Sequence, residues 1–237
     1  MVNVADGFRF ENKYIVTTGQ IQLIQCHLEG ICYQDFFSDD TGSYDIRSLY
    51  FDDYAGSAYR DNEVGIEPRS KFRLRIYNCK SDVIFLEQKI KIAGKIRKDR
   101  VQVSREFCEL VLRNEWHKLD YPVSNGLINR FLTAHYTKGL LPKIIVDYNR
   151  ETYVYPEGDV RITFDRNISF SDEVEHFFEE DILLQPIMKA GTELLEVKYT
   201  DFIPDFIHQG VNIKQLQQYT FSKYYLCEMH KRNGGRV

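Results

Sequence analysis

The sequence lacks the short motifs that assign common chemistries. It has no phosphate-binding loop of the G-x-x-x-x-G-K-[ST] type, because Gly94-Lys95 has neither the upstream glycine nor a following Ser or Thr. The patterns G-x-G-x-x-G, G-x-S-x-G and H-E-x-x-H are absent as well. Its six histidines are scattered along the chain and predict no catalytic or metal centre. These absences exclude nucleotide binding through a phosphate-binding loop.

Paired cysteines, a targeting segment and long apolar runs are also missing. The five cysteines are odd in number and widely spaced, and no C-x-x-C pair points to structural zinc. With aliphatic neighbours, they are expected to be reduced core residues of a cytosolic protein. The first residues, MVNVADGFRFENKY, show no secretory signal, and no apolar run approaches the ~20 residues of a membrane helix. We therefore expect a cytoplasmic protein with no membrane segment in this chain.

Strong overall charge is absent too. The formal net charge is -4, whereas a protein that coats nucleic acid is normally basic. No aromatic platform for RNA is recognisable, so no nucleic-acid partner is expected. Hydrophobic residues make up 43% and charged residues 28% of the 237, which is typical of a globular protein. We expect one domain, residues 1–237, with a basic interior inside an acidic shell.

Three segments alternate basic and apolar residues. The clearest is 71–76, in which Lys71, Arg73 and Arg75 alternate with apolar side chains, and segments 8–14 and 86–92 show similar patterns. Residues two apart in a strand share a face. The ordinary interpretation is a half-buried sheet with a solvated outer face. The alternative is that several cationic faces turn toward each other and bind a polyanion with many phosphates.

The apolar patterns predict eight strands and four or five helices. Strands are expected at 8–16, 43–52, 70–78, 83–92, 99–104, 143–155, 159–168 and 193–200. One helix is expected to begin at Thr17 or Thr18, with an apolar stripe from Ile21 to Ile31. Two more are expected to begin at Ser104 and at Ser124. A further helix is expected from about residue 212 to about residue 230. The order shows no βαβ units, which indicates an α+β protein with an antiparallel sheet and helices packed outside. If the basic faces point inward, those helices cover the outward apolar faces.

Further charged residues continue the pattern. Lys98 follows Gly94, Arg150 ends the run IIVDYNR, and Arg161 shares a face with Thr163 and Asp165. In LLEVKY, Glu196 stands beside Lys198 on one face. A glutamate among so many cations is either an ion-pair partner or an oxygen ligand for Mg²⁺ or Mn²⁺, and the spacing alone leaves both open.

Seven runs together resemble the VTC domain, the polyphosphate polymerase domain of the vacuolar transporter chaperone complex. These runs are IRSLYFDD (46–53), KFRLRIY (71–77), FLEQKIK (85–91), DYNRETY (147–153), VRITFDRNI (160–168), LLEVKY (194–199) and QQYTFSKYYL (217–226). They cover nearly the whole chain in the right order. The resemblance places the chain in the triphosphate tunnel metalloenzyme (CYTH-like) superfamily. It implies an antiparallel eight-stranded β-barrel that forms a tunnel.

The resemblance also assigns roles, position by position. It implies phosphate binding by Lys13, Arg73, Arg75, Lys89, Lys98, Arg150, Arg161, Lys198, Ser222 and Lys223. Among these, the residues expected to act directly in catalysis are Arg73, Arg75, Lys89, Arg150 and Arg161. Glu196 matches the metal-binding glutamate, with Glu11 or Glu87 as a further ligand of Mn²⁺ or Mg²⁺.

The sequence departs from the superfamily at its start. Many members open with E-x-E-x-K, whereas this chain has Arg9, Glu11 and Lys13. The missing carboxylate fits polymerases better than simple triphosphatases. The SPX domain and membrane anchor of the eukaryotic complex have no counterpart here, and a membrane-associated partner is left open.

The resemblance thus implies a metal-dependent enzyme that transfers the γ-phosphate of ATP to a growing polyphosphate chain and releases ADP. Two alternatives stay open. One is hydrolysis of triphosphate or nucleoside triphosphate in the same tunnel, and the other is polyphosphate binding without turnover.

Overall fold

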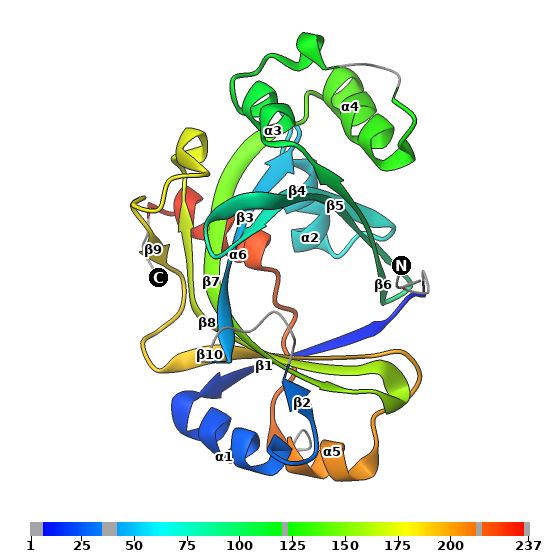
Figure 1. Cartoon of the computed structure of the whole chain (residues 1–237), viewed down its shortest axis with the longest axis vertical. Helices are drawn as coiled ribbons and strands as arrows, with labels where there is room; N and C mark the ends of the chain where they lie inside the picture. The colour runs from blue at the N-terminus through cyan, green and yellow to red at the C-terminus, as the bar shows by residue number, and fades with distance from the viewer. Residues whose placement is uncertain (1–6, 35–41, 120–122, 212–214, 235–237) are drawn as a thin grey trace.

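A computed structural model describes residues 7–34, 42–119, 123–211 and 215–234 (Figure 1). Its strands are β1 (Phe10–Thr17), β2 (Tyr33–Gln34), β3 (Ser43–Asp52), β4 (Arg69–Tyr77), β5 (Lys80–Ile92), β6 (Lys95–Val103), β7 (Leu141–Tyr155), β8 (Val160–Ser171), β9 (Gln185–Pro186) and β10 (Thr192–Tyr199). Its α-helices are α1 (Thr18–Leu28), α2 (Ser57–Val64), α3 (Arg105–Leu112), α4 (Gly126–Lys138), α5 (Asp205–Gly210) and α6 (Lys223–Arg232). Single 3-10 turns span Trp116–Lys118, Glu157–Asp159 and Val174–His176.

The eight long strands form one antiparallel sheet. Their order is β1-β10-β8-β7-β3-β4-β5-β6, and the short strands β2 and β9 add to β7 and β8. The two ends of this path meet at Arg9 and Ile96, whose main chains exchange N–H···O bonds of 2.9 and 3.1 Å. All eight predicted strands are present, and the predicted α+β fold with a curled antiparallel sheet and outer helices is confirmed.

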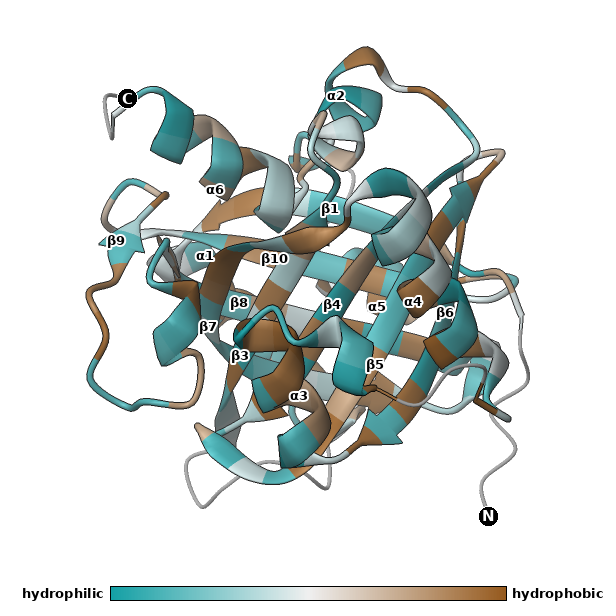
Figure 2. Ribbon diagram, turned by 90° about the horizontal axis from the view of Figure 1, so that it is seen from above, coloured by the Kyte–Doolittle hydropathy of each residue, from teal (hydrophilic) through white to brown (hydrophobic). Residues whose placement is uncertain are grey.

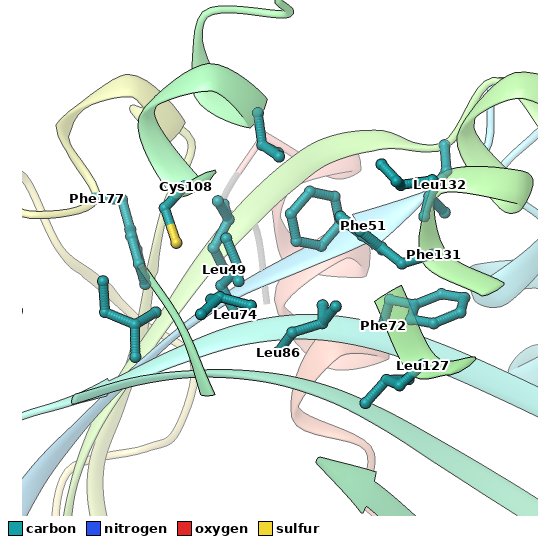
Figure 3. Packing of buried hydrophobic residues seen from close by; sticks show 14 of the residues in the cluster. Leu49, Phe51, Phe72, Leu74, Leu86, Cys108, Leu127, Phe131, Leu132 and Phe177 are labelled. Carbon is teal, nitrogen blue, oxygen red and sulfur yellow. The ribbon is translucent and has the colours of Figure 1, made fainter. Parts of the chain in front are cut away.

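Helices cover the apolar faces of the strands. Hydrophilic and hydrophobic bands alternate along the strands in Figure 2. The apolar side of β4 and β5, with Leu74 and Leu86, packs with Cys108 of α3 and Phe131 of α4 (Figure 3). At the other end of the molecule, α1 and α5 lie together and pack against the apolar sides of β1, β8 and β10 (Figure 1). The charged side chains of these strands therefore lie on the opposite face.

Local capping explains where the first helices begin. The Thr17 hydroxyl accepts a bond from the Gln20 main chain, and the Gln20 side chain accepts one from the Thr17 main chain, which is a capping box. Ser104 caps α3 at the Phe107 N–H, as predicted. The third helix is capped by Asn125 and not by Ser124, because the Asn125 side chain accepts bonds from the first turn of α4.

Two helix predictions were wrong at their ends. Ile31 lies beyond α1 and is 41% exposed, so it does not continue the buried stripe. The last helix begins at Lys223 and not near 212. Residues 216–222 are not helical, because this segment pairs with β1 through a Tyr219 N–H bond to the Lys13 carbonyl of 2.9 Å. Residues 212–214, including Ile213, lie outside the described residues.

The cysteine prediction holds in part. All five cysteines are free, and Cys108 and Cys227 are buried, but Cys26 is exposed because it lies on the outer side of α1. Among the described residues, no helix has the length and apolar character needed to cross a membrane.

Candidate phosphate-binding and metal site

The charged faces of the strands turn toward one another. Lys89 of β5 donates to both carboxylate oxygens of Glu11 on β1, each at 3.0 Å. These two strands are not neighbours in the sheet, since β1 begins the path and β5 lies near its far end. A solvated outer face cannot produce this contact, so that ordinary interpretation of the alternation was wrong for these strands. We call this inward-facing set of charges the interior cluster.

The structure brings all the predicted site residues into the interior cluster. They come from β1 (Glu11, Lys13), β4 (Arg73, Arg75), β5 (Glu87, Lys89), β6 (Lys98), β7 (Arg150), β8 (Arg161), β10 (Glu196, Lys198) and the start of α6 (Ser222, Lys223). Exposure of the side chains varies from 0% at Glu87 to 39% at Lys98. Water therefore reaches part of the cluster.

Glu196 and Glu11 form the first acidic group. Glu196 pairs with Lys198 at 2.8 Å, with Lys223 at 2.9 Å and with Lys13 at 3.3 Å. The same Lys13 ammonium lies 2.9 Å from Glu11. One lysine thus links the two carboxylates, and together they face four further cations, which are Lys89, Arg150, Lys198 and Lys223.

Glu87 forms a separate acidic group. It pairs with Arg73 at 2.6 Å and with Lys98 at 3.0 Å, and the Arg75 guanidinium lies 4.0 Å away. Its side chain is fully buried. Because Glu87 holds the paired arginines of β4, the structure gives it a different neighbourhood from the Glu11 and Glu196 pair.

Asp165 is an interior residue that the sequence analysis did not count. Its carboxylate accepts two bonds from Arg150, of 2.6 and 2.7 Å, and pairs with Lys223 at 2.5 Å. The shared face with Arg161 was the signal for its position. A carboxylate was not expected beside phosphate-binding arginines, and here it fixes the plane of one of them.

The sequence analysis also did not assign the two tyrosines that accept hydrogen bonds from the paired arginines of β4. The Arg73 guanidinium donates to the Tyr50 hydroxyl at 2.8 Å, and Arg75 donates to Tyr148 at 3.0 Å. Arg75 also donates to Ser48 at 3.1 Å. Burial alone would raise the pKa of Tyr50, but the neighbouring arginines outweigh it and lower that pKa. These neutral groups orient the guanidinium groups without cancelling their charge.

Lys71 completes the basic face of β4. It donates to Asn62 and to Ser222, both at 3.0 Å, and lies 5.2 Å from the centre of the Tyr224 ring. Burial, together with the charges of Arg69, Lys89 and Lys13, lowers the pKa of Lys71 to about 7. It was part of the alternating pattern but not of the assigned site.

The pKa values of other charged groups in the cluster are also shifted. Burial would raise the pKa of Glu11 and Glu196, but Lys13 and its neighbours outweigh this and hold both values well below the usual range. Burial lowers the pKa of Lys89 and of Lys98 to about 8, although each has a glutamate partner. The carboxylates are therefore ionised at neutral pH, while the pKa values of these two lysines lie close to neutral pH.

The start of α6 is fixed to the cluster. The Lys13 ammonium donates to the Phe221 carbonyl at 2.6 Å, and Ser222 caps the helix by accepting from the Tyr225 N–H at 3.3 Å. Lys223 follows directly and reaches both acidic residues of β8 and β10. The segment that leads into α6 is thus held against β1.

Comparison with known proteins identifies the family. The VTC domain matches residues 8–228. The chain belongs to the VTC domain family.

One solved structure supports the fold, and two others show a weaker likeness. HpAC1 from Hippeastrum, described as an adenylyl cyclase with a dominant triphosphatase activity, is 14% identical with a TM-score of 0.55, covering 97% of each chain. An adenylate cyclase homologue from Bacillus halodurans is 12% identical over 97% of this chain and 91% of that one, with a TM-score of 0.49. The Mimivirus capping enzyme triphosphatase is 11% identical over 89% of each chain, with a TM-score of 0.36. No match was found among curated proteins. The VTC domain thus has the triphosphate tunnel (CYTH-like) fold, which with the family supports a function related to polyphosphate or triphosphate.

The acidic residues of this VTC domain fit a metal ion that is shared with substrate. In the described part of the chain, no three His, Cys, Asp or Glu side chains are grouped to hold an ion by themselves. Glu11 and Glu196 lie on either side of the Lys13 ammonium, which is 2.9 Å from Glu11 and 3.3 Å from Glu196. Mg²⁺ commonly binds one or two carboxylates and completes its shell with phosphate oxygens and water. Two ionised carboxylates beside phosphate-binding cations suit that chemistry.

Proposed function

We propose that this VTC domain is a metal-dependent polyphosphate polymerase that transfers the γ-phosphate of ATP to polyphosphate and releases ADP. The observation that carries the proposal is the interior cluster, in which cations from seven strands and α6 lie together with the carboxylates of Glu11, Glu87 and Glu196. Such a surface suits a chain of phosphates far better than a single phosphate group. We propose the thirteen predicted residues as its phosphate-binding, catalytic and metal-binding groups.

Phosphoryl transfer asks mainly for alignment and charge stabilisation. Arg73 and Arg75 are held by Glu87, Tyr50 and Tyr148, so their donors are already positioned for the oxygens of the transferred group. Arg150 is fixed in the same way by its two bonds to Asp165. A divalent ion at Glu11 and Glu196 would supply charge stabilisation on bridging phosphate oxygens. Lys89 and Lys198 border that position and would bind the same phosphates.

The acceptor is proposed to be polyphosphate and not water. Activation of water needs a general base, and Glu11, Glu87, Asp165 and Glu196 are each ion-paired. An ionised phosphate end needs none. Arg9 stands where many superfamily members have a carboxylate, and it pairs with Asp159 at 2.6 Å. The triphosphatase activity ascribed to HpAC1 keeps hydrolysis as the second candidate.

We also propose that residues 1–237 form one domain, because β1 and β10 at opposite ends of the chain are paired. ATP as donor fits a cytoplasmic location. Binding without turnover is the third possibility, and the retained Glu11 and Glu196 pair argues against it.

One assay tests the proposal. The purified protein is incubated with ATP and Mn²⁺, and the products are separated on a gel beside a measurement of released phosphate. We expect long polyphosphate and ADP. An Arg75→Ala variant should lose the product, whereas Arg130→Ala, which removes a partly exposed arginine paired with Asp99 outside the cluster, should retain it. Orthophosphate as the sole product would favour the hydrolase.

A further inference from the structure

Three aromatic side chains form a continuous line at one end of the interior cluster. Tyr44 of β3, Tyr77 of β4 and Phe85 of β5 come from adjacent strands. The ring centres of Tyr44 and Tyr77 are 5.9 Å apart, and those of Tyr77 and Phe85 are 6.4 Å apart in an edge-to-face arrangement. We call these three residues the aromatic line.

The aromatic line lies next to the phosphate-binding charges. Tyr77 is two residues from Arg75 on β4, and Phe85 is two residues from Glu87 on β5, so each ring shares the inward face with that charge. Tyr44 stands opposite Arg150 in the pairing of β3 with β7. The order along the strands is therefore rings first, then the arginines, and then the Glu11 and Glu196 level.

Two arginines border the aromatic line. The Arg100 guanidinium lies 4.8 Å from the Phe85 ring centre, and Arg161 donates to the Tyr44 hydroxyl at 3.2 Å. Arg100 is exposed, and Tyr77 and Phe85 are partly exposed, so this end is open to solvent.

The other end of the cluster differs. There Tyr50, six residues along β3 from Tyr44, has its ring centre 5.3 Å from that of Tyr224 on α6. Lys71 is bonded to Ser222 at the start of the same helix. A flat ligand thus finds the partly exposed rings of Tyr77 and Phe85 at the end with the aromatic line, where Tyr44 is buried, and a packed helix at the opposite end.

We propose that the aromatic line is the base-binding wall for the donor nucleotide, with the triphosphate directed past Arg75 and Arg150 toward Glu11 and Glu196. Aromatic side chains stack with every base, and arginine adds cation–π attraction. The rings read no base edge, so purine nucleotides should bind somewhat better than pyrimidine nucleotides through contact area alone. This inference rests on the proposed function, because it assumes a nucleoside triphosphate donor.

Binding measurements without metal test the assignment. The ligands are ATP and inorganic tripolyphosphate, and the variants are Tyr77→Leu and Phe85→Leu, which keep an apolar side chain in a partly exposed position. We expect each variant to weaken ATP binding about tenfold and to change tripolyphosphate binding less than twofold. Phe206→Leu on α5 is the matched control, since Phe206 is 46% exposed and contacts Tyr155 away from the cluster. It should change neither affinity.

Proton NMR gives a second readout. Stacking on the rings should shift the adenine ring protons of bound ATP upfield, and Phe85→Leu should reduce that shift. An unchanged ratio of ATP to tripolyphosphate affinity in both variants would overturn the inference and leave polymerase activity untouched. Equal weakening of both ligands would also overturn it, because the rings would then only support the wall. If ATP binding depends on the rings but no polyphosphate forms, the proposed function fails and the base-binding wall stands.

Discussion

We predict that Lys71 makes the proposed polyphosphate binding dependent on pH. With a pKa of about 7, it is roughly nine-tenths charged at pH 6 and one-tenth charged at pH 8. A bound polyanion favours the charged form, so binding at pH 8 should take up about 0.9 proton at Lys71, against about 0.1 at pH 6. Because the bound state has the higher pKa, affinity falls as pH rises, by about tenfold over this interval.

Lys89 and Lys98 contribute in the same direction. Because their pKa values are about 8, each would contribute at most about half a proton to the uptake on binding at pH 8. Their side chains are 34% and 39% exposed, so solvent screening reduces these contributions, and the prediction rests on Lys71.

Calorimetric titration with long-chain polyphosphate, in two buffers of different ionisation enthalpy, measures the proton uptake. Lys71→Arg keeps the charge at every pH, so it should take up about 0.9 proton less than the wild type at pH 8. Its affinity should lose the tenfold fall that Lys71 causes between pH 6 and 8 and keep only the smaller fall that comes from Lys89 and Lys98. Ionisation of the ligand's own ends is the same in both proteins and cancels. Equal proton uptake by wild type and Lys71→Arg would show that Lys71 does not carry the effect.

Three further predictions concern the proposed reaction. Arg73→Ala should weaken tripolyphosphate binding about 10- to 100-fold in calorimetry, because it removes a charge-assisted contact, and wild-type affinity in a folded variant would contradict its role. Glu196→Gln should abolish Mn²⁺-dependent turnover while metal-free polyphosphate binding stays equal or tightens, since a negative charge leaves a cationic site; surviving turnover would make Glu196 an ion-pair partner only. Added tripolyphosphate should shorten a lag in ADP release by occupying the acceptor position, measured at constant ionic strength. Simple competitive inhibition, with orthophosphate as product, would end the polymerase proposal.

The sequence predicted the strands well because their two-residue period is a local property. Lys71, Arg73 and Arg75 were assigned to one face correctly from spacing alone. The direction of that face was not decided, since curling of the sheet depends on pairing between strands far apart in the chain. The contact between Lys89 and Glu11, separated by 78 residues, settled it.

The missed parts depend on tertiary contacts. The apolar spacing after residue 212 suggested a long helix, yet pairing with β1 keeps Gln218 and Tyr219 extended. Tyr50 and Asp165 have the right position in their strands, but only the three-dimensional arrangement shows which arginine each one holds. The aromatic line was invisible for the same reason, because its rings come from three separate strands.

The carboxylates of the interior cluster explain how the cations remain in place without substrate. A buried arginine left unpaired is strongly destabilising, so each needs an acceptor in the folded protein. Glu87 serves Arg73, Arg75 and Lys98, and Glu196 serves several lysines, so each carboxylate faces more than one cation. Under the proposed function, phosphate would therefore meet donors that are already oriented and still carry excess positive charge. Removing a carboxylate should raise affinity for phosphate while loosening the arrangement that aligns it, which separates binding from catalysis within one cluster.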